Sequence, residues 1–313
     1  MEDQTHMFRK TGSLLTAALL GLTATVGWAG PAAAAPADSA DAATFSLSRL
    51  VLEPTERGYQ GKLRVTITNT GDSTDVFYFQ IREPVAASFA GGPESHCDPD
   101  GVSEGRLVRT CGLPGGSELA PGESRTAPVE FQVLTTPRSY PMIADGGFVT
   151  VNSASAGALG TVPFSARFRS LSGSLSNPQT YVQDTQPDAS IELAGPVTDG
   201  PENTRRVPVR VRYAGDAPNL RLELNAAPLP AGSAILYTEP TNGPTYGGEA
   251  SVPGGQMMAG EERDLALFFT RPTDPADEST PISLEVSTSW IATTTDVDPS
   301  DNTVTFNLAL SAS

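Results

Sequence analysis

The sequence predicts an all-β protein built from two consecutive antiparallel β-sandwiches. Three observations lead to this fold class. Apolar residues recur at every second position in many short runs, and no segment keeps a helical period over three turns. The 313 residues include 30 glycines and 27 prolines, which interrupt the chain too often for long helices. Two segments also resemble each other, and this duplication accounts for the length.

The first 34 residues have the three parts of a secretory signal peptide. Arg9 and Lys10 precede a short apolar run over 13–29, and an alanine-rich exit follows. We expect cleavage after Ala34, with Ala29 as the alternative site. An uncleaved membrane anchor is the competing interpretation, but the apolar run is shorter than the roughly 18 residues of a spanning helix. We therefore expect a secreted, extracellular protein with no membrane span after cleavage; the sequence leaves open whether it is retained at the cell envelope.

The first sandwich is expected to span residues 44–169, after a disordered N-terminal segment over 35–43. Its strands are predicted where apolar residues alternate with polar ones or where β-branched and aromatic residues cluster. These runs lie at 45–50, 62–69, 76–81, 106–110, 128–134, 147–151 and 161–168.

A polar stretch beginning at Ser170 predicts a linker over 170–183, and the second sandwich is expected to occupy 184–313. Its predicted strands have the same character as those of the first. They lie at 191–193, 206–213, 220–224, 234–237, 264–269, 282–289 and 303–310.

The duplication shows in two pairs of segments. An alternating strand ends in a Gly-Asp turn at 63–72 and again at 207–216. A tight acidic turn then leads into another alternating strand, from 119–124 in the first copy and from 258–262 in the second.

Four short elements occur in a common order along the two copies. They are Asn69-Thr70-Gly71, Leu119-Ala120-Pro121-Gly122-Glu123, Leu229-Pro230-Ala231-Gly232 and the acidic run from Asp296 to Asn302. Together they resemble a bacterial immunoglobulin-like repeat of secreted and surface proteins, the "domain of unknown function eleven" repeat, which is close to adhesion-type CARDB modules. The resemblance covers about residues 44–310. It implies tandem immunoglobulin-like sandwiches at an envelope or outside the cell, and no catalytic residues.

Cys97 and Cys111 are the only cysteines of the chain. In an exported protein a lone pair of this kind predicts a disulfide. A redox-active pair is the alternative, but the spacing differs from the C-x-x-C pattern of such sites.

Asp296, Asp298 and Asp301, with Asn302, form the densest cluster of oxygen donors. Ca²⁺ takes six to eight oxygen ligands, so these residues are the candidate metal site. The spacing is not that of an EF-hand, and the alternative is a turn in which the side chains cap their own backbone. We expect no other cofactor.

The formal net charge of −16 and the pI near 4.5 argue against nucleic acid as a partner. His96 is the only histidine that remains after leader removal. A hydrolase would have to use it with nearby acids, and no G-x-S-x-G motif is present. We therefore expect a protein that is not an enzyme.

The resulting functional hypothesis is a non-catalytic protein for adhesion or scaffolding that contacts an envelope or extracellular protein. The alternative is an accessory module that binds envelope carbohydrate or Ca²⁺. Sugar binding would require an exposed aromatic side chain, and Trp290 lies in a strand setting that favours the core. Tyr140, Tyr237 and Tyr246, near Gly/Pro loops, are the remaining candidates.

Overall fold

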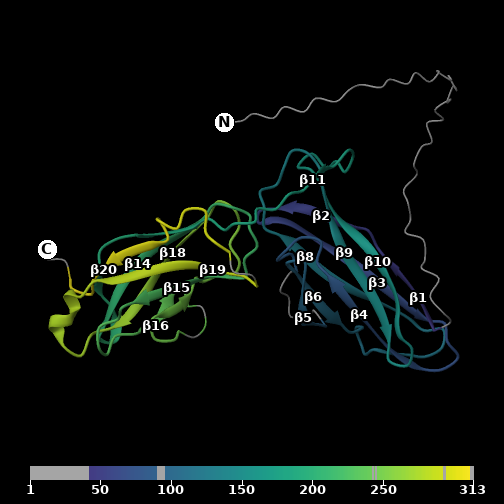
Figure 1. The fold of residues 1–313 in the computed structure, drawn as a ribbon, viewed down its shortest axis with the longest axis horizontal. Helices are drawn as coiled ribbons and strands as arrows, with labels where there is room; N and C mark the ends of the chain where they lie inside the picture. Colours follow the sequence, from purple (N-terminus) through teal and green to yellow (C-terminus); the bar gives the residue numbers. More distant parts are fainter. Residues whose placement is uncertain (1–41, 90–95, 242, 244, 292–293, 311–313) are drawn as a thin grey trace, which may run out of the picture. The chain divides into compact units, whose positions relative to one another are not determined.

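The computed structural model describes residues 42–89, 96–241, 243, 245–291 and 294–310. These residues form twenty β-strands and two short 3-10 helices, η1 (Pro201–Asn203) and η2 (Pro275–Ser279), with no α-helix among them (Figure 1). The predicted all-β class is thus confirmed. No helix in the described part of the chain is long and apolar enough to cross a membrane. The expected signal peptide and residues 35–41 lie outside the described residues, and Ala43 already opens the first strand.

The first eleven strands belong to one hydrogen-bonded arrangement of two layers. One layer contains β8, β3 and β1, and the other has the order β10-β9-β4-β6-β5. β2 belongs to both, because residues 53–55 pair with β3 while residues 50–52 pair in parallel with β10. The bounds are β1 Ala43–Leu47, β2 Leu50–Thr55, β3 Gly58–Asn69, β4 Asp75–Arg82, β5 Cys97–Ser103, β6 Arg106–Cys111, β7 Glu118–Leu119, β8 Ser124–Val133, β9 Met142–Ser153, β10 Gly157–Phe168 and β11 Gln179–Thr180.

Side-chain alternation along these strands builds a core between the layers. On β3, Leu63, Val65 and Ile67 are fully buried, whereas Lys62 before them and Arg64 between them are exposed. The inward residues of both layers form one continuous hydrophobic cluster.

The remaining strands surround a second hydrophobic cluster, drawn from residues 189–308. They form two antiparallel sheets, with the orders β12-β14-β18-β16 and β17-β15-β19-β20, and β13 pairs with β14. The bounds are β12 Ala189–Leu193, β13 Thr198–Asp199, β14 Thr204–Tyr213, β15 Arg221–Ala227, β16 Ile235–Glu239, β17 Glu249–Ser251, β18 Glu261–Thr270, β19 Ile282–Ser289 and β20 Thr303–Phe306.

A glycine–glutamate turn leads into β8. Gly122 has φ +78°, which favours glycine, and its N–H donates to the Asn69 carbonyl at 2.8 Å. The Glu123 carboxylate accepts the Ala120 N–H at 3.0 Å and pairs with Arg125 at 2.6 Å. One glutamate thus holds both the turn and the strand that follows it.

The turn into β18 repeats this arrangement. Gly260 has φ +80°, and its N–H donates to the Tyr213 carbonyl at 2.7 Å. The Glu261 carboxylate accepts the Met258 N–H at 2.8 Å and pairs with Arg263 at 2.8 Å. The two turns therefore share their hydrogen bonds and their ion pair residue for residue.

The segment expected as a linker, 170–183, is attached to the first strand group over most of its length. The Leu171 N–H donates to the Arg138 carbonyl at 2.9 Å, and the Tyr181 N–H donates to the Ile143 carbonyl at 2.8 Å. Between them, β11 pairs in parallel with β9. The Tyr181 ring lies 5.0 Å from the ring of Phe168, which explains why this polar segment is ordered against the core.

Candidate functional site

β15 presents a row of polar side chains on the outer face of its sheet. Leu222 and Leu224 are fully buried, and Arg221, Glu223 and Asn225 alternate with them along the strand. Because successive side chains of a strand point to opposite faces, these three residues lie on the face away from the core.

The neighbouring strands extend this row sideways. Asn225 lies opposite Glu249 of β17 and opposite Glu285 of β19, and Glu223 lies opposite Ser287 of β19. Side chains directly opposite each other on one face are about 5 Å apart. The sheet therefore carries a closely spaced lattice of carboxylate, amide and hydroxyl groups.

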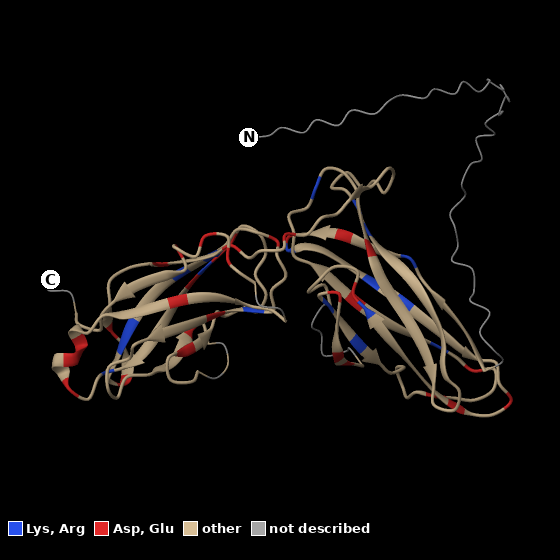
Figure 2. Ribbon diagram, in the orientation of Figure 1, with Lys and Arg blue, Asp and Glu red and all other residues tan. Residues whose placement is uncertain are grey.

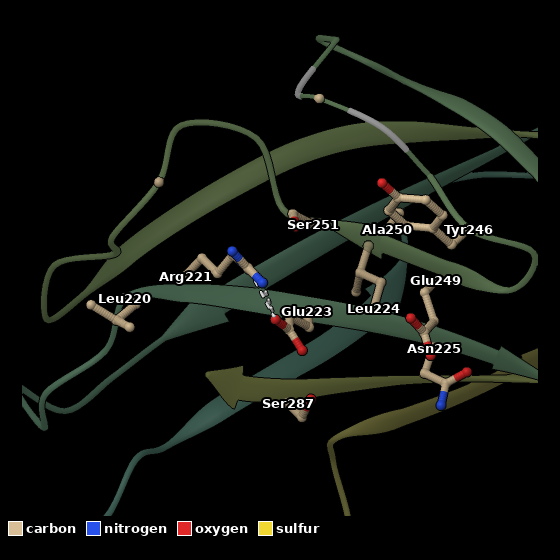
Figure 3. A pocket seen from close by; sticks show the side chains of 12 residues that line it. Leu220, Arg221, Glu223, Leu224, Asn225, Tyr246, Glu249, Ala250, Ser251 and Ser287 are labelled. Carbon is tan, nitrogen blue, oxygen red and sulfur yellow. Dashed lines mark hydrogen bonds and ion pairs between the residues drawn. The ribbon is translucent and has the colours of Figure 1, made fainter. Parts of the chain in front are cut away.

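A groove of about 600 Å³ lies over this lattice (Figure 3). Its volume falls within the roughly 300–1,000 Å³ that is typical of small-molecule sites. We define the β15 groove by six of its lining residues: Arg221, Glu223, Asn225, Tyr246, Glu249 and Ser287.

Most polar groups of the β15 groove have no partner among the residues that the structure describes. Arg221 and Glu223 form an ion pair at 2.8 Å, drawn as a dashed line in Figure 3. The side chains of Asn225, Glu249 and Ser287 make no hydrogen bond or ion pair to another described residue, whereas on β14 and β18 Arg210 pairs with Asp264 and Arg212 with Glu262. Figure 2 marks where acidic and basic residues lie along the strands. These three side chains are exposed and free to bind a ligand.

Tyr246 is the aromatic residue of the groove, and 71% of its surface is exposed. Reciprocal backbone hydrogen bonds of 3.1 and 2.9 Å join it to Glu249, so the residue is held in a tight turn at the start of β17. The backbone is therefore ordered while the ring is open to solvent. This is the exposed aromatic position that the sequence proposed for Tyr246.

The other aromatic candidates have different surroundings. Tyr237 stacks on Phe268 with ring centroids 4.4 Å apart, and Tyr140 is 38% exposed in a loop of the first strand group. Trp290 follows β19 and is half-buried.

The predicted metal residues bind backbone groups instead. Asp296 accepts the N–H groups of Ala189 at 3.0 Å and of Asp298 at 3.1 Å. Asp298 accepts the Ser300 N–H at 3.1 Å and its hydroxyl at 2.6 Å. Burial, with the neighbouring carboxylates, raises the pKa of Asp301. No set of three or more His, Cys, Asp or Glu side chains in the described ranges is placed to hold a metal ion, and the geometry matches the alternative of a capping turn.

The predicted disulfide is present between Cys97 and Cys111, which lie directly opposite each other on β5 and β6. His96 precedes β5 as an exposed residue, and its carbonyl accepts the Gly112 N–H at 2.8 Å. The disulfide therefore closes an exposed hairpin at the edge of the first strand group.

Comparison with known proteins identifies no family. No family model and no curated protein matches the chain. Among solved structures, a protein of unknown function from Porphyromonas gingivalis W83 is 14% identical, with 84% of this chain and 97% of that chain covered and a TM-score of 0.21. A YadV chaperone is 8% identical, covers 85% and 99%, and has a TM-score of 0.20.

A third similar structure is the CsuC–CsuE chaperone–tip adhesion subunit complex of Acinetobacter baumannii Csu pili. It is 9% identical, covers 78% and 93%, and has a TM-score of 0.22. Scores at this level carry no argument about the fold or the function of the chain.

Sequence reasoning identified the strand over 220–224 and the aromatic residue Tyr246, but not that they meet. The available signal was the alternation of polar residues with leucines, with Arg221 and Glu223 between leucines and Asn225 after Leu224. What joins these residues to Glu249 is the pairing of β15 with β17, which the local sequence does not encode.

Proposed function

We propose that the chain is an exported, non-catalytic binding protein made of two tandem immunoglobulin-like sandwiches. The duplication is supported by the shared Gly-Glu-x-Arg turns before β8 and β18 and by the two separate hydrophobic clusters. Export is supported by the leader-like sequence and by the disulfide, which persists in oxidising compartments. The proposed role is contact with an envelope or extracellular molecule, for adhesion or scaffolding.

The β15 groove is the observation that carries this proposal. On an ordered sheet face, the Glu249 carboxylate, the Asn225 amide and the Ser287 hydroxyl have no partner in the described part of the chain, and an exposed tyrosine lies beside them. Such a surface gains hydrogen bonds when a ligand binds, and the rigid strands limit the entropy lost. Binding needs no nucleophile, metal or cofactor, in agreement with a non-catalytic role.

The proposal is tested by cosedimentation of the mature protein with cell-envelope fragments of the organism that produces it. Ser287→Arg places a long charged side chain in the groove and should reduce the sedimented fraction at least fivefold. Ser283→Arg is the matched control, because this residue is on the same strand and the same face, about 13 Å away and outside the groove lining. Equal sedimentation of both variants and the unmodified protein would refute the groove as the contact surface.

A further inference from the structure

We propose that the β15 groove binds a neutral, hydroxyl-rich oligosaccharide, with the Tyr246 ring against one sugar face. The inference rests on the proposed function and adds the chemical class of the ligand. Asn225, Glu249 and Ser287 are the residues that would bind the hydroxyl groups.

The hydrogen-bonding groups of the groove match sugar hydroxyls, each of which both donates and accepts. Asn225 offers two N–H donors and a carbonyl acceptor, Ser287 offers a hydroxyl of both kinds, and Glu249 accepts through two oxygens. A ligand with only acceptors would leave the Glu249 carboxylate unmatched, and one with only donors would leave the Asn225 amide N–H groups unmatched.

Tyr246 supplies the apolar part of such a site. The residue is 71% exposed although its backbone is fixed by hydrogen bonds to Glu249. A sugar ring has a face of C–H groups between its hydroxyls, and an aromatic ring buries this face while leaving the hydroxyls to the polar residues. An aromatic platform beside a polar lattice is therefore suited to a pyranose.

The charge of the groove favours a neutral sugar over an acidic one. Arg221 is paired with Glu223, and Glu249 has no cationic partner among the described residues. The whole chain carries a formal charge of −16, which repels a uronate or phosphate-bearing polymer. Arg221 is the one cation among the described residues that line the groove, so an acidic glycan would have to displace Glu223 from it.

The lattice spacing favours a chain of sugars over a single one. Polar side chains recur about 5 Å apart across strands and about 7 Å apart along β15. Tyr246 and Asn225 lie toward one end of the groove, since both neighbour Glu249, whereas Ser287 lies opposite Glu223 one row away. A ligand that contacts both rows has to span about 7 Å along β15, which favours an oligosaccharide over a single sugar.

The test uses titration calorimetry of the mature chain with a panel of neutral trisaccharides: maltotriose, cellotriose, xylotriose, mannotriose and N,N′,N″-triacetylchitotriose. Trigalacturonate serves as the acidic counterpart. At least one neutral trisaccharide should bind, and trigalacturonate should bind at least tenfold more weakly. Tyr246→Ala should weaken the neutral ligand about tenfold or more, and Tyr246→Phe should retain binding because the ring remains. Tyr140→Ala is the control at an exposed tyrosine outside the groove.

Two results would overturn the inference: no neutral trisaccharide binding up to about 10 mM, or equal affinity of Tyr246→Ala and the unmodified chain. The envelope assay separates this failure from that of the proposed function. If Ser287→Arg abolishes cosedimentation while no sugar binds, the groove is a contact surface for a protein and only the ligand class is wrong. If neither assay responds, the groove has no binding role and both proposals fail.

Discussion

Replacing Glu83 with glutamine should strongly destabilise the first strand group. Glu83 is fully buried directly after β4, and its two carboxylate oxygens accept four backbone N–H groups. Oε1 binds Ala87 at 2.9 Å and Leu107 at 2.8 Å, and Oε2 binds Ser88 at 2.8 Å and Phe89 at 3.2 Å. Burial raises the pKa of Glu83, and the four hydrogen bonds oppose that shift.

The magnitude follows from counting the donors. The glutamine carbonyl replaces one oxygen and keeps two N–H partners, but its NH₂ group faces the other two donors, which lose this acceptor. The Ser88 N–H also donates to the Val85 carbonyl at 3.2 Å and so keeps one acceptor in either orientation. A buried N–H without an acceptor costs about 1–3 kcal/mol, so the sum is about 2–6 kcal/mol. Removing the cost of burying a charge offsets part of this sum. We expect the free energy of unfolding of the first strand group to fall by about 1–4 kcal/mol.

The assay is native-state hydrogen exchange, because it reports the first strand group separately from the second. The Leu107 N–H on β6 should exchange at least about fivefold faster in Glu83→Gln, which corresponds to about 1 kcal/mol. Glu118→Gln, at an exposed glutamate on β7, is the control for the chemical change. A Glu83→Gln chain with unchanged protection at Leu107 would show that the carboxylate does not hold this loop.

The remaining predictions concern acid, the shared turn and the disulfide. Burial alone would raise the pKa of Glu278, but hydrogen bonds from Arg205 and Arg271 outweigh it and lower the value. The stability that Glu278 contributes is therefore fully present above the pKa of an unfolded glutamate, about 4.3, and is lost as the pH falls through its folded pKa. Glu278→Gln should flatten the acid branch of a plot of unfolding free energy against pH. Gly260→Ala should cost about 1–2 kcal/mol in thermal unfolding, because a φ of +80° strains alanine although nothing lies within 4 Å of the new methyl group; an unchanged midpoint would contradict the left-handed turn. Replacing Cys97 and Cys111 together by serine should cost up to about 3 kcal/mol, and mass spectrometry of the exported protein should show two hydrogens fewer than the reduced chain.

The strands could be predicted because their signal is local. Every predicted run overlaps an observed strand, from 45–50 at β1 and β2 to 303–310, of which β20 covers 303–306. Alternation of period two needs only the neighbouring residues, and the buried Leu63, Val65 and Ile67 follow it without exception.

Sequence reasoning missed or misplaced the strands whose local sequence does not have the alternating pattern or whose bounds are set by pairing. β5 contains Asp98-Pro99-Asp100-Gly101, which has the composition of a turn, but it pairs with β6 next to the disulfide. The predicted run over 45–50 is divided, because β1 ends at Leu47 and β2 begins at Leu50. The second of these strands then reaches β10, more than a hundred residues away in the sequence.

Sequence comparison finds the acidic turn in both copies. In the second copy the turn begins one residue earlier in the structure, at Met257, than the sequence alignment predicts. The structure makes Met257, which is 1% exposed, the counterpart of Leu119, which is 0% exposed, so the two turns align without a gap. The sequence comparison misses this equivalence because the second copy has a methionine where the first has a leucine, and the burial of both side chains identifies them as equivalent core residues.

The β15 groove could not be predicted for a different reason: its residues come together only when strands that are separate in the sequence pair with each other.

The position of β2 determines how the first strand group responds to tension. Residues 50–52 run parallel to residues 166–168 of β10. When the N-terminal end of the first strand group is pulled away from its C-terminal end, these two strands are therefore drawn past each other along their axes. Their hydrogen bonds are then loaded together in shear, whereas the bonds of a hairpin pulled at its open end break one after another. For a protein proposed to hold on to a surface, this geometry provides a mechanical clamp, and single-molecule extension should show one force peak for the first strand group when its ends are drawn apart.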